Sequence, residues 1–109
     1  MNYFAVPGFV KNVPIEPKSI IQKVCEYFQI EDETLYCRCR KRNFVTPRHI
    51  AMYLLLKNTN LTLKGIGEIF HRDHTTVINA RVVIENYKFC KDENIIHALT
   101  EIQNNLRVN

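Results

Sequence analysis

The stretch from Thr62 to Tyr87 constrains the fold of this chain more than any other part of it. Thr62 is a residue type that caps helices, and a short apolar period follows it. His71 and Arg72 suit a tight turn, after which Asp73 can cap a second, longer helix. A short helix, a turn and a capped second helix define a helix-turn-helix. The apolar positions are Leu63, Ile66 and Phe70 in the first helix and Val77, Ala80, Ile84 and Tyr87 in the second.

The second helix of this motif has two opposite faces. At 100° per residue, with Val77 at zero, its other apolar positions fall within about 80°. Thr75 and Asn79 lie on the opposite face, one turn apart, with Ile78 and Val82 nearby. Asparagine can make a bidentate contact with adenine, and threonine and isoleucine can touch the thymine methyl group. We therefore expect this face to read bases in the major groove, where the second helix of such motifs lies.

The positive charge of the chain is concentrated in one segment. The formal net charge is +4, from 15 basic and 11 acidic residues. Five of the basic residues lie between positions 38 and 48, where there is no acidic residue. The rest of the chain has ten basic and 11 acidic residues. A localised basic patch indicates an anionic partner, and helix N-termini also favour phosphate. The residues of this patch are Arg38, Arg40, Lys41, Arg42 and Arg48.

Helical periods also fill the chain on both sides of the motif. Pro17 suits the first turn of a helix, and Thr46 with Pro47 is an N-cap and N1 pair that predicts the start of another. No segment alternates with a period of two, so we predict an all-α bundle of five or six helices. Outside the motif, the predicted helices cover about 17–28, 31–36, 47–58 and 93–106.

Two segments lack a helical period. The first 14 residues include Pro7, Gly8 and Pro14, and we expect an extended or flexible N-terminal arm there, followed by one domain over 15–109. The basic stretch from Cys37 to Asn43 has no apolar period, and it is predicted to be a loop.

Several classes of protein are disfavoured by the sequence. No apolar run approaches 18 residues and the N-terminus lacks a secretory signal, so we expect a cytoplasmic, nucleoid-associated protein without a membrane partner. Cys37 and Cys39 are too close for a zinc pair, and His71 and His74 straddle a turn. No nucleophile–base or carboxylate pair has convincing spacing. We expect no metal, no cofactor and no enzymatic activity.

Two motifs give the chain a family resemblance. Residues 47–54 read PRHIAMYL, and residues 72–77 read RDHTTV. Together with the positions between them, they resemble the C-terminal DNA-binding domain of the DnaA family, the bacterial chromosomal replication initiators. The resemblance covers about 90 residues, from Ile15 to Arg107, and its motifs are highly specific. It implies a helical domain that binds a short duplex element, the DnaA box.

The resemblance also implies individual roles at the positions that match the family. The helix that begins at Asp73 would enter the major groove, and Arg40 would enter the minor groove. The remaining contacts fall on bases, phosphates or the nearby backbone. The implied base contacts are Asp73, His74 and Thr75; the implied phosphate or adjacent-base contacts are Arg48, His49 and Thr76; and Leu63 and Lys64 lie near backbone contacts.

The chain departs from the family at several of these positions. His49 stands where glutamine is common, and Asn79 stands where histidine is common. Val82 and Val83 replace basic residues, and the turn before Arg72 is one residue shorter than usual. The resemblance therefore implies the family's docking mode but leaves the preferred DNA sequence open.

The sequence predicts sequence-specific binding of duplex DNA at DnaA-box-like sites, linked to replication initiation or its regulation. No GxxxxGK[ST] motif is present, so we expect a reader of DNA without an ATPase module. Replication proteins are a further candidate class of partner, and a bacterial, phage or mobile-element origin is expected. Two alternatives stay open: a transcriptional repressor, or a protein-interaction module whose apolar contact surface includes Ile78, Val82 and Val83.

Overall fold

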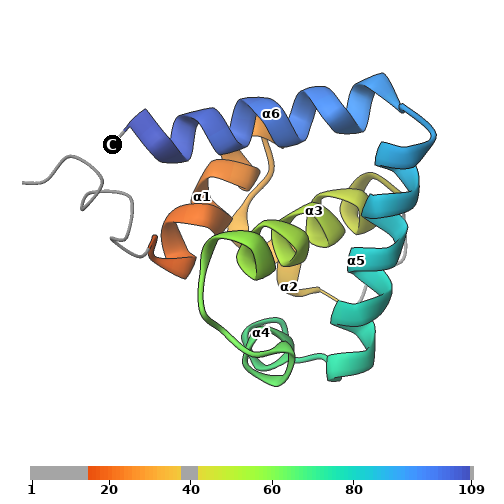
Figure 1. Ribbon diagram of the computed structural model, residues 1–109. Helices are drawn as coiled ribbons and strands as arrows, with labels where there is room; N and C mark the ends of the chain where they lie inside the picture. The colour runs from red at the N-terminus through yellow and green to blue at the C-terminus, as the bar shows by residue number, and fades with distance from the viewer. Residues whose placement is uncertain (1–14, 38–41, 109) are drawn as a thin grey trace, which may run out of the picture.

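The computed structural model describes residues 15–37 and 42–108, and the side chains at 42, 107 and 108 fall outside that description. The described residues form six helices and no strand, which confirms the all-α prediction (Figure 1). None of these helices is long and apolar enough to cross a membrane. The predicted N-terminal arm lies outside the described residues. The helices are α1 (Pro17–Phe28), α2 (Asp32–Tyr36), α3 (Arg42–Asn58), α4 (Leu63–Ile69), α5 (His74–Phe89) and α6 (Glu93–Val108).

Helix α3 is the centre of the domain and contacts each of the other five helices. Figure 1 shows α3 running through the middle, with α6 crossing above it and α5 running down one side. Six consecutive residues of α3, 50–55, are at most 4% exposed. A helix that is buried all round in this way must be apolar on every face, and this segment reads IAMYLL.

The structure corrects the predicted start of this helix. The sequence predicts a start at Thr46 and Pro47 and a loop up to Asn43, but α3 begins at Arg42 and contains Pro47 in its interior. Proline has no N–H to donate to the carbonyl four residues earlier, at Asn43, so one backbone hydrogen bond is lost. Pro47 is buried. Tertiary packing therefore outweighs the local signal for a helix start.

The remaining predicted helices lie within two residues of their expected bounds. Pro17 is in the first turn of α1, and Leu35 of α2 is fully buried, as predicted. Asp92 caps α6 by accepting a hydrogen bond from the Ile95 amide at 3.1 Å. The core residues of α1 and α6 recur every three or four positions. They are Ile20, Ile21, Val24 and Cys25 in α1, and Ile95, Ala98, Leu99, Ile102 and Leu106 in α6.

Three helices end in the same way although none of them ends on glycine. Gln29, His71 and Lys91 have φ of 57°, 56° and 59°, in the left-handed region. At each end, the amide of the left-handed residue donates to the carbonyl three residues earlier. The amide of the next residue donates to the carbonyl five residues before it, which completes the Schellman arrangement. Non-glycine residues adopt this conformation at a cost of roughly 1–2 kcal/mol. These ends therefore hold local strain that packing and hydrogen bonds offset.

Candidate nucleic-acid interface

Helices α4 and α5 form the predicted helix-turn-helix, with both helices capped. The Thr62 hydroxyl accepts a hydrogen bond from the Gly65 amide at 3.0 Å. Gly67 of α4 lies so close to the turn that an added Cβ atom would be 2.5 Å from the Arg72 carbonyl oxygen. Only glycine permits this approach. The two helices are therefore held together by their backbones as well as by apolar packing.

The turn between the helices is fixed by its own hydrogen bonds. The Arg72 amide donates to the Gly67 carbonyl at 2.7 Å, and the His71 amide donates to the Glu68 carbonyl at 3.2 Å. His71 takes the left-handed conformation that completes this reversal. A turn with this many backbone hydrogen bonds sets a defined angle between α4 and α5.

Helix α5 has the two faces that its sequence predicts. Val77, Ala80 and Ile84 are fully buried. On the opposite side, Thr75 and Asn79 are exposed. We call the exposed side of α5 the reading face, and we define it by Thr75, Asn79, Val82 and Asn86. Val82 is 44% exposed, which agrees with its expected place on this face.

Asp73 and His74 are linked to each other at the start of α5. The Asp73 carboxylate accepts a hydrogen bond from the His74 amide at 3.0 Å, which confirms the predicted cap. The same oxygen is 3.2 Å from His74 Nδ1. Both side chains are more than half exposed. The carboxylate is thereby directed toward the helix N-terminus, whose partial positive charge stabilises it.

Two arginines converge on the backbone just before the basic stretch. Arg48 donates from Nη2 to the Cys37 carbonyl at 2.8 Å and from Nε to the Leu35 carbonyl at 2.8 Å. Arg72 donates from Nη2 to the same Cys37 carbonyl at 2.6 Å and from Nη1 to the Phe70 carbonyl at 2.7 Å. Both guanidinium groups therefore attach the chain at Cys37, one to α3 and the other to the turn before α5.

Arg48, a predicted contact to phosphate or an adjacent base, lies beside backbone carbonyls of the domain. Its side chain is only 5% exposed and faces backbone carbonyls of the domain. Moving the guanidinium away from these acceptors would leave their carbonyls without these hydrogen bonds, at a cost in free energy. Arg48 holds the backbone at Cys37, and its contact with DNA stays a prediction.

His49 is half-buried beside Arg48. Burial, and secondarily the Arg48 charge, lower the pKa of the His49 imidazole from its ordinary value. The imidazole is therefore neutral at pH 7, where it can offer a hydrogen bond but no charge.

The structure places the other predicted site residues at varied depths. Lys64 is exposed on α4, whereas Leu63, Thr76 and Ile78 are half-buried. Arg38 and Arg40 lie outside the described residues. Arg42 is the first residue of α3, and its side chain is outside the description. The described part of the interface thus consists of the N-terminal end and reading face of α5 and the start of α4.

Sequence reasoning missed two residues that organise this site, Arg72 and Gly67. Arg72 directly precedes the cap of α5, a place from which a long cation can reach back to the carbonyls of the turn. Gly67 lies inside a helix, where glycine is unfavourable without a packing reason. Within residues 15–37 and 42–108, no cluster of three or more His, Cys, Asp or Glu side chains could hold a metal ion.

The fold and this geometry define the class of the protein: an all-α helix-turn-helix DNA-binding domain. The family described as "Bacterial dnaA protein helix-turn-helix" matches residues 17–84. The chain belongs to this family, which confirms the resemblance in its sequence motifs.

Curated relatives agree with this assignment. The chain is 39% identical over 97 residues to the chromosomal replication initiator protein DnaA of Caldanaerobacter subterraneus subsp. tengcongensis, which covers 89% of this chain and 22% of the relative. It is 35% identical over 96 residues to the chromosomal replication initiator protein DnaA 1 of Chlamydia pneumoniae, and the match covers 87% of this chain and 21% of the relative. A DnaA from Roseiflexus castenholzii is 43% identical to it over 65 residues, and the match covers 59% of this chain and 14% of the relative. The chain spans about a fifth of the length of the first of these relatives.

Proposed function

We propose that this chain binds duplex DNA sequence-specifically at DnaA-box-like sites and acts in replication initiation or its regulation. The observation that carries the proposal is the reading face of α5, which is exposed and polar at its N-terminal end while the opposite face is buried. Family membership supports the same activity. The relatives are named as replication initiators, and this supports the link to replication.

The N-terminal half of α5 would lie in the major groove. Thr75 and Asn79 are the exposed groups best suited to touch base edges, a thymine methyl and an adenine respectively. Asp73 and His74 start the same helix and would contact adjacent bases. Each good base contact contributes about 1–3 kcal/mol of discrimination against the wrong base.

The basic stretch would supply a second, minor-groove contact through Arg40, with Arg38 and Arg42 on phosphates. Cys37, which directly precedes the stretch, supports this proposal. Its carbonyl accepts hydrogen bonds from Arg48 of α3 and from Arg72 in the turn before α5. This attachment places Cys37 next to the turn before α5.

Phosphate contacts would come from the exposed Lys64, from Thr76 and His49, and from the amides at the start of α5. Leu63 would lie beside the backbone without a polar contact. Such contacts position the protein on DNA and carry no sequence information directly.

Selection of preferred sites from a random duplex pool tests the proposal directly. Enrichment of a short site that resembles the DnaA box supports it, and absence of any enriched site contradicts it. If the four cations Arg38, Arg40, Arg42 and Lys64 each neutralise about one phosphate, affinity falls roughly 150-fold between 50 and 200 mM salt. A salt-insensitive complex would also contradict the proposal.

Two substitutions separate base reading from phosphate binding. Arg40→Ala should reduce affinity for the preferred site more than for random DNA, whereas Lys64→Ala should weaken both alike. Equal losses in the two variants would refute base reading by Arg40.

One observation favours a second candidate, a protein-interaction module that keeps the fold without box recognition. Val82 is 44% exposed on the reading face, and Phe89 at the end of the same helix is 87% exposed. Exposed apolar side chains on one helix suit a protein partner. Binding to box and scrambled DNA with equal affinity would favour this candidate.

A further inference from the structure

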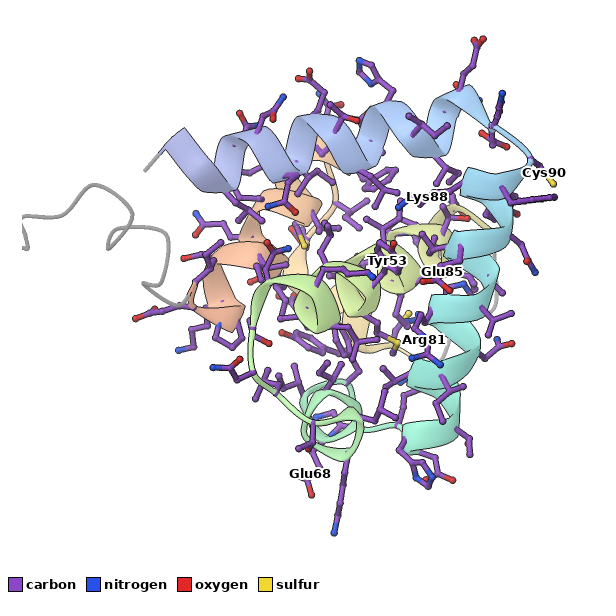
Figure 2. All side chains as sticks on the ribbon, in the orientation of Figure 1. Tyr53, Glu68, Arg81, Glu85, Lys88 and Cys90 are labelled. Carbon is purple, nitrogen blue, oxygen red and sulfur yellow. The ribbon has the colours of Figure 1, made fainter. Side chains whose placement is uncertain are left out.

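A groove of about 480 Å³ lies between α3, α5 and α6, away from the reading face. Figure 2 shows Lys88 pointing from α5 toward Tyr53 on α3, with Arg81 and Glu85 further along the same side of α5. At 100° per residue, Lys88 is about 150° from the centre of the reading face. The groove therefore lies on a different side of α5 from the reading face.

The floor of the groove is apolar and its rim is polar. Leu54 and Leu99 lie at its base and are 2% and 8% exposed, and Ile96 beside them is 37% exposed. Thr100 and Gln103 of α6 line one edge. An apolar floor with polar groups at its edge is typical of a site for protein side chains.

Two lysines each lie near one buried ring, that of Tyr53, at the opposite edge. Tyr53 is 4% exposed, and Lys88 Nζ donates a hydrogen bond to its hydroxyl at 3.1 Å. Lys88 Nζ and Lys57 Nζ are each 5.4 Å from the centroid of this ring. Each ammonium group is thus within cation–π range of the same ring, and both lysines line the groove.

No acidic side chain of the domain neutralises this pair of lysines. Within residues 15–37 and 42–108, neither Lys57 nor Lys88 forms an ion pair, and no Asp or Glu lines the groove. Glu85, one turn before Lys88 on α5, is exposed and forms no ion pair with it. Two unneutralised cations beside an apolar floor attract an anionic group that also carries apolar neighbours.

We propose that this groove docks an acidic, amphipathic segment of a partner protein. A carboxylate of that segment would bind between Lys57 and Lys88, and its apolar side chains would cover Leu99 and Ile96. A nucleic-acid backbone fits less well, because it would leave the apolar floor uncovered and would have to approach from outside the reading face.

The test uses the full 109-residue chain and two fluorescein-labelled helical peptides. One peptide combines a leucine stripe with glutamates, and its match replaces every glutamate by glutamine. Fluorescence anisotropy gives the affinity, and amide chemical shifts give the place of binding. The variant Lys57→Gln/Lys88→Gln removes both charges, and Lys18→Gln on α1 is the matched control.

The proposal predicts that the glutamate peptide binds and shifts the amides of Tyr53, Leu99 and Gln103. The double variant should weaken it roughly fivefold or more, since each exposed pair contributes up to about 1 kcal/mol. Lys18→Gln should leave it unchanged. The proposal is overturned if the glutamate peptide does not bind, if the glutamine peptide binds equally well, or if the shifts lie elsewhere. It is also overturned if the double variant instead weakens binding of a duplex and the duplex shifts these same amides.

Discussion

Arg72 donates a hydrogen bond to the carbonyl oxygen of Cys37 at 2.6 Å, across 35 residues of sequence. The bond joins the turn before α5 to the backbone just before the basic stretch. Arg48 reaches the same oxygen from α3 at 2.8 Å. The two elements proposed to contact the two grooves of DNA are therefore attached to each other through one carbonyl group.

Arg72→Lys should weaken both the fold and the preference for one DNA sequence. A lysine has one nitrogen and cannot bridge the Cys37 and Phe70 carbonyls as the guanidinium does. Because hydrogen bonds from charged groups contribute about 1.5–3 kcal/mol, we expect a loss of that size in the free energy of unfolding. Urea denaturation and anisotropy with box and scrambled duplexes measure the two effects.

Arg81→Lys is the matched control for this substitution, because Arg81 is exposed on α5. Its stability should stay within about 0.5 kcal/mol of the unmodified chain. If both variants behave alike, Arg72 does not have the anchoring role assigned to it.

Gly67→Ala should destabilise the domain by about 1–3 kcal/mol, because its Cβ atom would collide with the backbone of the turn. The nearest atom is the Arg72 carbonyl oxygen, at 2.5 Å. Gly65→Ala, two residues earlier in the same helix, would meet only the Thr62 hydroxyl at 3.3 Å and a Leu61 methyl at 3.7 Å. Its stability should change by less than about 1 kcal/mol. Thermal denaturation measures the stability of both variants. Equal losses of stability would argue against the close approach of Gly67 to the turn.

Gln29→Gly should stabilise the domain, since it relieves a left-handed conformation at the end of α1. The expected gain is about 1 kcal/mol. For a domain of this size, that gain raises Tm by roughly 4 °C. Gln22→Gly, in the interior of the same helix, should instead cost about 1 kcal/mol. A fall in Tm for Gln29→Gly would contradict the assigned conformation.

Acidification should destabilise the domain partly through His49. Burial lowers the pKa of this imidazole, so the folded state disfavours the protonated form that the unfolded state accepts near its ordinary pKa of 6.5. The stabilising contribution is therefore complete above that pH and is lost as the pH falls. Between about pH 7.5 and about pH 5.5, Tm should fall less for His49→Gln than for the unmodified chain. An equal fall in both proteins would exclude His49 as a source of the pH dependence.

The faces of α5 could be predicted because burial leaves a periodic signal. Val77 and Ile84 are apolar and buried, Asn79 is polar and exposed, and their spacing follows the helix repeat. The caps at Thr62 and Asp73 were predictable for a similar reason, since each is a local arrangement of one side chain and nearby amides.

The start of α3 and the hydrogen-bond acceptors of Arg48 could not be predicted in this way. Pro47 carries a strong local start signal, but packing of the helix around it decides the outcome. Arg48 donates to carbonyls 11 and 13 residues away, and Arg72 to one 35 residues away. Bonds over such separations depend on the tertiary fold and leave no periodic pattern. The sequence near Arg48 and Arg72 therefore gives no local sign of the carbonyls that these side chains bind.

The reading face of α5 is proposed to recognise a particular DNA sequence. The most direct measurement is the ratio of two affinities, one for a DnaA-box duplex and one for a scrambled duplex, determined by anisotropy at fixed salt. The ratio is measured for the unmodified chain and for Asn79→Ala. Asn94→Ala, on the exposed side of α6, is the control. The unmodified chain and Asn94→Ala should prefer the box by about 10³-fold or more, the range of specific DNA-binding proteins. Asn79→Ala should lower this ratio by roughly tenfold, equivalent to one lost base contact. A ratio near one for the unmodified chain, or the same ratio in both variants, would contradict the claim.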